Sequence, residues 1–271
     1  MLHSPAVLAT SLGLAARLGA VWAYRDLVRH LVLRDLRHKY KGSTLGFAWS
    51  LANPLLMAIV YTVAFKYIVR LPIDRFPLFL VSGLLPWTFF AASLGAATGS
   101  IVDNAGLVRK VAFPRLVLPI AAVLAQFVQF LLTYALVIPA IALVDGPLAS
   151  SMLGVVPVVL LQLVFTCGLG LVLAIAYVHA RDTRHLVEVA LQIWFWLTPI
   201  VYSLALVPDR LRAVIAWNPM SWYVEAYHAA VVGERWPEPT SLAVMVALSA
   251  SSALAGLLVF TRHERRLAEL L

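Results

Sequence analysis

Charged residues are scarce in this sequence of 271 residues. Asp, Glu, Lys and Arg make up 13% of it, against about a quarter in a typical soluble domain, whereas 62% of its residues are hydrophobic. The apolar residues gather in stretches of about 20 or more, the length that an α-helix needs to cross a bilayer core. An ordinary soluble domain is therefore excluded, and the sequence predicts a polytopic membrane protein.

Cysteine is almost absent as well. The single residue, Cys167, excludes an internal disulfide, and its apolar surroundings indicate a small packing residue. The sequence also has no Lys or Arg before Arg17, whereas a cleaved signal peptide has a positive segment ahead of its apolar core. We therefore expect no cleaved signal, and we expect the membrane spans themselves to target the chain.

A site for ATP is missing too. Residues 42–46 have a glycine at each end, but no Lys follows them and they do not connect a strand to a helix, as a phosphate-binding loop would. The chain is thus expected to bind no ATP and to need no cofactor of its own. Any energy for work across the membrane has to come from a partner.

Ionisable residues are nearly absent from the interiors of the apolar stretches. Proton-coupled carriers and intramembrane enzymes normally place Asp, Glu or His at membrane depth, so both classes are disfavoured. Glu225 and His228, three residues apart outside these stretches, could share a metal ion, but the chain offers no second pair of this kind. We expect no metal site there, and we interpret the two residues as a surface or gate-lining pair.

Six membrane spans are predicted, and they define an all-α membrane fold. The candidate spans are residues 45–69, 76–101, 116–144, 152–178, 186–206 and 241–261. Several prolines fall within or beside them, which membrane helices tolerate because neighbouring helices satisfy the freed backbone groups. The chain is accordingly divided into a cytoplasmic segment (1–44), the membrane domain (45–261) and a short cytoplasmic tail (262–271).

The distribution of charge predicts the orientation. With six spans, 15 of the 21 Lys and Arg residues fall on the side that holds both termini, in 1–44, 102–115, 179–185 and 262–271. The other side has 6, so the positive-inside rule places both termini in the cytoplasm. This asymmetry accounts for the whole net charge of +8, and nucleic acid is not expected as a partner.

Two segments outside the spans are predicted to form shorter helices. Residues 21–41 alternate apolar and basic positions at a spacing near four, which indicates an amphipathic helix lying on the cytoplasmic membrane surface among lipid headgroups. The external segment 207–240 contains Asn218-Pro219, a helix-start signal, and Gly233, which fits a helix C-terminus. Because the stretch between them is too short to span, we expect short re-entrant or interfacial helices.

Aromatic side chains take the place of ionisable ones in and beside the spans. Such rings stack on sugars, contact lipid tails or simply fill the core, and the sequence leaves these alternatives open. The candidate channel aromatics are Trp49, Tyr61, Trp87, Phe89, Phe90, Trp194, Phe195, Trp196 and Tyr202.

Several short segments, in this order, resemble one transporter family. They are Lys39-Tyr40-Lys41, Leu45-Gly46, Trp49, Asn53-Pro54, residues 82–87 (SGLLPW), residues 104–119, Arg181-Asp182, residues 198–202 (TPIVY) and residues 217–220 (WNPM). Together they are similar to permeases of the type-2 ABC transporters that export polysaccharides, namely the O-antigen, teichoic-acid and capsule exporters. The resemblance extends over roughly residues 25–265.

The resemblance implies a machine of several chains in the bacterial cytoplasmic membrane. Two copies of the permease would form the channel, and two copies of a separate ATPase subunit would bind ATP and magnesium. A helix at 103–112, which Asn104 is expected to cap, would couple the two proteins. The alternative for this loop is a basic segment that only obeys the orientation rule. The candidate coupling residues are Asn104, Leu107, Arg109, Lys110, Val111, Phe113 and Pro114.

The resemblance also implies the substrate, a polysaccharide linked to undecaprenyl diphosphate. Arg34, Arg37, Lys39 and Lys41 would then receive the diphosphate at the cytoplasmic leaflet, since Lys and Arg bind phosphate well. The external helices would form an outer gate with Trp217, Trp222, Tyr223, Glu225, Tyr227 and His228. The alternatives are the permease of a drug or lipid exporter and, from another class, a membrane-embedded enzyme that acts on lipid-linked sugars.

Overall fold

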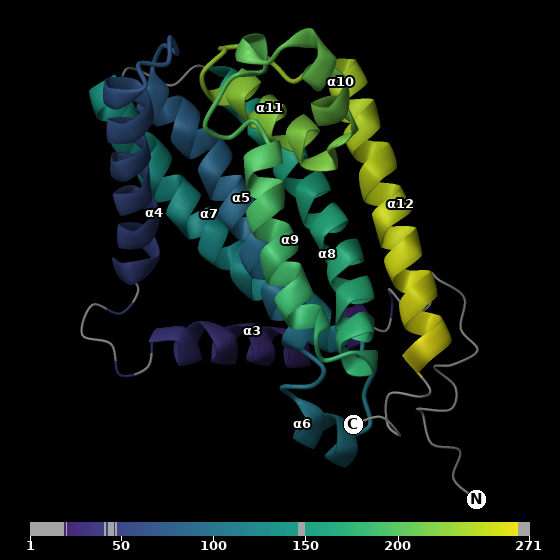
Figure 1. The fold of residues 1–271 in the computed structure, drawn as a ribbon. Coiled ribbons are helices and arrows are strands. Elements are labelled where there is room, and N and C mark those ends of the chain that lie inside the picture. The colour runs from purple at the N-terminus through teal and green to yellow at the C-terminus, as the bar shows by residue number, and fades with distance from the viewer. Residues whose placement is uncertain are drawn as a thin grey trace, which may run out of the picture.

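The computed structural model describes residues 21–40, 48–145 and 150–264, together with Gly19, Gly42 and Gly46. Within these residues every regular element is a helix (Figure 1). Lys41 lies outside the described residues, and Lys39 is described only through its backbone.

Four helices are long and apolar enough to cross a membrane, and they confirm long apolar helices at four of the predicted spans. Their apolar residues run on without a charged interruption, so each helix continues for 24 residues or more. The four are α5 (Phe76–Gly99), α7 (Val117–Asp145), α8 (Val155–His179) and α12 (Pro239–His263).

The first and fifth predicted spans are not among these four helices. The first consists of α4 (Ala48–Tyr61) and a π-helical continuation, η1 (Thr62–Ile68). The fifth becomes α9 (Thr183–Leu197), which at 1.5 Å per residue is about 22 Å long, against about 30 Å for the bilayer core. The prediction that a helix spans 186–206 is wrong. The helix α9 ends at Leu197, two residues before Pro199, because a proline ring cannot continue the helix. Six spans stay a prediction.

The helix α5 lies at the centre of the bundle and contacts α4, α7, α8, α9 and α11. The helices α8 and α12 approach each other most closely through glycine. A Cβ on Gly168 would meet the backbone of Ser252, and one on Gly256 would meet the backbone of Gly168. This close approach lets the Ser252 hydroxyl donate to the carbonyl of Phe165 at 2.8 Å.

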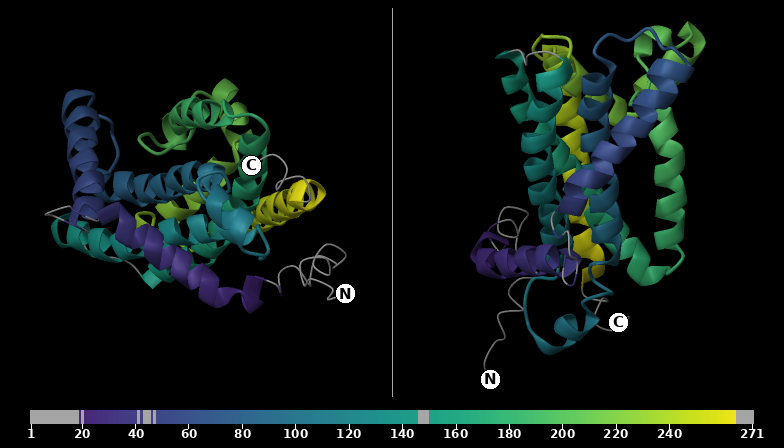
Figure 2. Two further views of the ribbon diagram at one scale, coloured as in Figure 1. Left: turned by 90° about the horizontal axis from the view of Figure 1, so that it is seen from below. Right: turned by 90° about the vertical axis from the view of Figure 1, so that its left-hand side faces the viewer.

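The amphipathic helix predicted near the N-terminus is confirmed as α3 (Arg25–Tyr40), which lies across one end of the bundle (Figures 1 and 2). Its apolar residues Val28 and Leu31 are buried in a cluster with Val117 and Leu118 of α7. The short helix α6 (Ala105–Lys110) projects at the same end. Both ends of the described chain lie here, because Val21 packs against the cluster that contains the last turns of α12.

Short helices occupy the opposite end of the bundle (Figure 1). They are η2 (Ser150–Gly154), η3 (Leu204–Leu206), α10 (Asp209–Trp217) and α11 (Pro219–Val231). The predicted helix start is confirmed, since Asn218 is the N-cap of α11 and Pro219 its first residue. The side-chain oxygen of Asn218 accepts from the backbone N–H of Met220 at 3.0 Å, as an N-cap residue does.

Candidate functional site: aromatic cluster, short helices and contacts of α6

An aromatic cluster joins the central helix α5 to α4 and α9. The rings of Trp87 and Phe90 lie 6.3 and 5.3 Å from the ring of Trp194. Phe195 follows on α9, with its ring 5.8 Å from Trp87 and 6.2 Å from Tyr61 of α4. The structure therefore brings five of the candidate channel aromatics together. Trp87 and Phe90 are buried in the core, whereas Tyr61, Trp194 and Phe195 are half-buried.

The remaining candidate aromatics lie elsewhere. Phe89 points to the other side of α5, where its ring stacks 5.2 Å from that of Phe130 on α7. Trp49 and Trp196 are both exposed, Trp49 near the start of α4 and Trp196 at the end of α9. The Tyr202 hydroxyl donates to the carbonyl of Trp196 at 3.1 Å. The nine candidates therefore do not form one continuous lining within a single copy.

A buried polar network links α5, α8 and α11, and the sequence-based reasoning missed it. The side chain of Gln162 is fully buried; its Nε2 donates to the carbonyl of Pro86 at 3.0 Å and its Oε1 accepts from the hydroxyl of Tyr227 at 2.7 Å. A glutamine in the middle of a long apolar stretch was the signal available in the sequence, because such a side chain needs a partner when buried.

Asn218 forms a second junction, between α9 and α11. Its Oδ1 also accepts from the indole Nε1 of Trp194 at 2.6 Å. Its Nδ2 donates to the carbonyl of Leu197 at 3.1 Å and to the hydroxyl of Thr198 at 2.9 Å. One amide thus fixes the end of α9, the start of α11 and one ring of the aromatic cluster.

The candidate gate residues divide into buried and exposed groups. Tyr223 and Tyr227 are fully buried, and the His228 imidazole stacks on Phe79 with ring centroids 3.8 Å apart. A Cβ on Gly83 would lie 2.8 Å from Nε2 of that imidazole, so a larger residue at this position would have to displace the His228 ring. These buried side chains dock α11 onto α5, α8 and α12.

The other gate candidates are accessible. Trp217 is 89% exposed at the end of α10, and Trp222 is half-buried with its indole N–H donating to the carbonyl of Ala216 at 3.0 Å. The Glu225 carboxylate is 3.8 Å from Nδ1 of His228, which is the contact that their spacing indicated. Among the described residues no group of three or more His, Cys, Asp or Glu is placed to hold a metal ion.

At the other end of the bundle, Arg34 connects α3 to the start of α6. Its Nη1 donates to Oδ1 of Asn104 at 2.8 Å, while its Nε and Nη2 donate to the neighbouring Asp35 carboxylate at 3.0 and 2.9 Å. Arg37 is exposed. Of the four proposed diphosphate residues, the structure thus places the side chains of two, and one of these is already bound within the chain.

The expectation that Asn104 caps α6 with its side chain is wrong. Asn104 does occupy the N-cap position, but its Nδ2 donates back to the carbonyl of Ser100 at 2.7 Å and its oxygen accepts from Arg34. The helix is also shorter than 103–112. Val108 is its buried residue and packs in the cluster of α3 and α7, whereas Val111, which follows the helix, is 50% exposed.

The outer surface of α6 is basic. Arg109 and Lys110 are exposed in its last turn, while Leu107, Phe113 and Pro114 are half-buried. Just before the helix, the Asp103 carboxylate accepts from Nη2 of Arg184 in the first turn of α9 at 3.1 Å. Most of the coupling candidates thus lie on or beside one projecting helix, which contacts α3 through Asn104, while Asp103 just before it contacts α9.

Four helices with the length and apolar composition of membrane spans are typical of a membrane protein. The chain belongs to the ABC-2 type transporter family, whose model matches residues 26–232.

Curated relatives cover most of the chain. It is 34% identical to the O-antigen export system permease protein RfbA of Myxococcus xanthus over 92% of this chain and 96% of the relative. It is 31% identical to a protein of the same name from Klebsiella pneumoniae, over 91% and 95% of the two chains. The polysialic acid transport protein KpsM of Escherichia coli is 25% identical over 89% and 95%.

Proposed function

We propose that this chain is the permease subunit of an ATP-driven exporter that moves an O-antigen-like polysaccharide across the bacterial cytoplasmic membrane. The supporting observation is the similarity along nearly the whole chain to permeases named for O-antigen export, with weaker similarity to capsule exporters. The half-buried rings of Tyr61, Trp194 and Phe195 suit this cargo, because aromatic faces pack against the C–H faces of sugars.

A separate ATPase would supply the energy through α6. The exposed side chains of Arg109, Lys110 and Val111 offer charge and an apolar contact to a groove on the partner. A movement of α6 would reach α3 through Asn104 and Arg34, and α9 through Asp103 and Arg184. Since α9 also carries Trp194 and Phe195, the same helix connects the contact with Asp103 to the aromatic cluster.

The transport path would form between two copies of the chain. The helices α4 and α9 contribute rings to the aromatic cluster and expose many apolar residues, which a second copy or lipid would cover. Six crossings in each copy would leave both termini in the cytoplasm, on the side of α3 and α6. Arg37, Lys39, Lys41 and Arg34 would meet the diphosphate of a lipid-linked substrate there.

The test is a deletion of the gene in its host, followed by complementation. Surface polysaccharide is measured on intact cells with an antibody or lectin, and the intracellular pool is measured after lysis. The proposal predicts loss of surface polymer and accumulation inside, both restored by the wild-type chain together with its ATPase. Unchanged surface polymer, or a defect confined to drug efflux, would contradict it. Export restored by the chain without any ATPase would contradict the coupling part.

A further inference from the structure

An apolar groove lies between the start of α3 and the long helices α7, α8 and α12. Its volume is about 460 Å³, within the range of roughly 300–1,000 Å³ that is usual for small-molecule sites. Its lining on α8 extends from Leu163 to Leu171 along one face of the helix, or about 12 Å at 1.5 Å per residue. Half of a hydrocarbon core of about 30 Å is about 15 Å, so the groove has nearly the depth of one leaflet.

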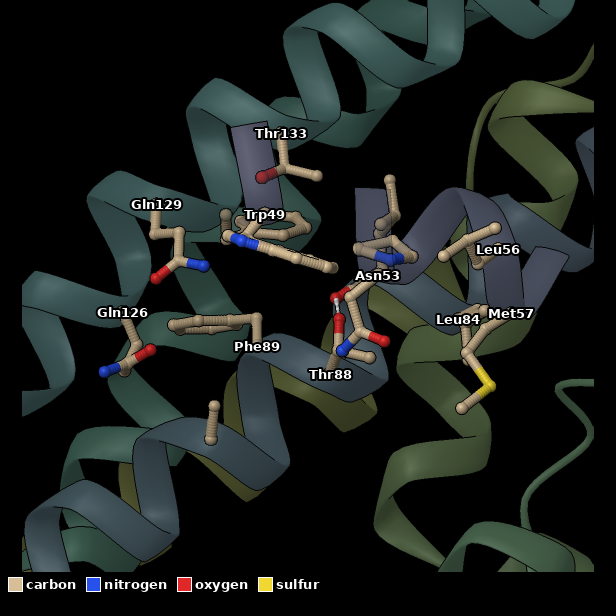
Figure 3. Close-up of a pocket in the computed structure, with 14 residues that line it drawn as sticks. Trp49, Asn53, Leu56, Met57, Leu84, Thr88, Phe89, Gln126, Gln129 and Thr133 are labelled. Atoms are coloured by element: carbon tan, nitrogen blue, oxygen red, sulfur yellow. Dashed lines mark hydrogen bonds between the residues drawn. The ribbon is translucent and has the colours of Figure 1, made fainter. Parts of the chain in front are cut away.

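The lining of this α3 groove suits hydrocarbon. Among the described residues that form it, no side chain carries a carboxylate, an amide or a hydroxyl group. The cavity in Figure 3 is different, since it lies between α4, α5 and α7 and contains the amides of Asn53, Gln126 and Gln129. An acyl chain in the α3 groove would therefore contact aliphatic side chains along its length without burying such polar groups.

A cation and an indole stand at the border of the groove. Trp22, just before α3, is 73% exposed, and Arg25, the first residue of α3, is exposed as well. The Arg25 guanidinium lies over the Trp22 ring, 5.9 Å from its centroid. No carboxylate of the described residues lies within ion-pairing distance of Arg25. The charge of Arg25 is thus left for an anion from outside the chain.

This combination indicates a phospholipid and not a protein segment. An apolar helix in the groove would cover Arg25 and give its charge no partner, which is costly. An anionic lipid provides both a chain for the groove and a phosphate for the guanidinium, and basic pockets between membrane helices bind such headgroups. A second copy of the chain is disfavoured here, because α4 and α9, which carry the exposed part of the aromatic cluster, contribute no described residue to the lining.

We propose that the α3 groove binds one anionic phospholipid, with an acyl chain between α3, α8 and α12 and the phosphate on Arg25. The Trp22 indole would lie at the level of the headgroup, as tryptophan does at membrane interfaces. The lipid would come from the leaflet on the side of α3. It would contact the start of the helix whose Arg34 bonds to Asn104 beside α6. This site goes beyond the proposed function and is independent of the cargo.

The test is native mass spectrometry of the purified full chain, titrated with phosphatidylglycerol or with phosphatidylcholine of the same acyl chains. One phosphatidylglycerol should bind about 5-fold more tightly than phosphatidylcholine, since one basic residue contributes about this factor to the binding of an anionic lipid. Arg25→Gln should remove the preference. Arg29→Gln is the matched control, because Arg29 is exposed one turn further along α3 but does not line the groove, and it should retain the preference.

A second pair of variants tests the position of the acyl chain. Ala253→Trp on α12 fills the groove and should lower the affinity for both lipids several-fold. Ala255→Trp, on an exposed part of the same helix outside the lining, should not. The unfolding temperature of each variant is compared with that of the wild type. Phosphatidylglycerol with a photoreactive acyl chain is also cross-linked to the wild-type chain, so one readout needs no substitution. The label should fall on residues 163–171 and 253–257.

Three results would overturn the inference. Equal binding of the two lipids would show that Arg25 does not select a headgroup. Equal loss of the preference in Arg25→Gln and Arg29→Gln would assign it to the general positive charge of α3. Cross-links outside the α3 groove, or displacement of phosphatidylglycerol by an equimolar amount of polyprenyl diphosphate, would show that another ligand occupies the groove.

Discussion

The hydrogen bond between Tyr227 and Gln162 should contribute measurably to the docking of α11. Both side chains are fully buried, and their 2.7 Å contact is short. Hydrogen bonds between membrane helices average about 0.6 kcal/mol and reach about 1.7 kcal/mol, so we expect about 1 kcal/mol for this one. Gln162→Leu should cost more, about 2–3 kcal/mol, because it leaves the Tyr227 hydroxyl and the Pro86 carbonyl buried without this partner.

The measurement is a double-mutant cycle with Gln162→Leu and Tyr227→Phe, followed by unfolding of the purified chain in mixed micelles. The double variant should be about 1 kcal/mol more stable than the sum of the two single losses predicts. Tyr223→Phe is the matched control on the same helix, since its hydroxyl contacts Ser249 at 2.8 Å and not Gln162. If Gln162→Leu and Tyr227→Phe are as additive as Gln162→Leu and Tyr223→Phe in the control cycle, the hydrogen bond does not contribute to the docking of α11.

Three further variants test other contacts. Asn218→Ala removes four hydrogen bonds at the α9–α11 junction, so it should lower the free energy of unfolding by about 2–3 kcal/mol and change the fluorescence of Trp194. A loss below about 0.5 kcal/mol would contradict the role of Asn218 in holding this junction together. Gly168→Val should separate α8 from α12 and cost about 3 kcal/mol or more in the same unfolding assay, whereas Gly95→Val, at a glycine with open space, should cost much less. Charge reversal at Asp103 or at Arg184 alone should reduce export, and reversal of both charges together should restore it. This exposed ion pair contributes only about 0.2–1 kcal/mol to stability, so the effect on export should exceed the effect on folding. A double variant that exports as poorly as the single variants would contradict coupling through this ion pair.

Local patterns predicted the elements that depend on nearby residues. Long apolar stretches predicted α5, α7, α8 and α12, since length and hydrophobicity are enough to define such helices. Asn218-Pro219 predicted the start of α11 because an N-cap bond reaches only two or three residues along the chain. The amphipathic spacing predicted α3 in the same way.

Tertiary contacts decided where those patterns failed. Asn104 has the right identity and position for a cap, but Arg34, 70 residues away in the sequence, takes its side-chain oxygen. Tyr223, Tyr227 and His228 were grouped with Trp217 by their aromatic character and their neighbourhood in the sequence. The packing of α11 against α5, α8 and α12 buries the first three, and no local signal shows which face a short helix will bury.

We propose that ATP hydrolysis on a partner drives polysaccharide through this chain, and that α6 transmits the movement of the partner. The most direct measurement uses proteoliposomes that contain the chain and its ATPase, with lipid-linked polysaccharide supplied on the ATPase side. We expect ATP-dependent passage of the polymer into the lumen, where added glycosidase cannot reach it. We also expect Arg109→Glu with Lys110→Glu to abolish this passage without unfolding the chain, because both side chains are exposed. Passage that needs no ATP, or that survives the double charge reversal unchanged, would show that α6 does not couple ATP hydrolysis to transport.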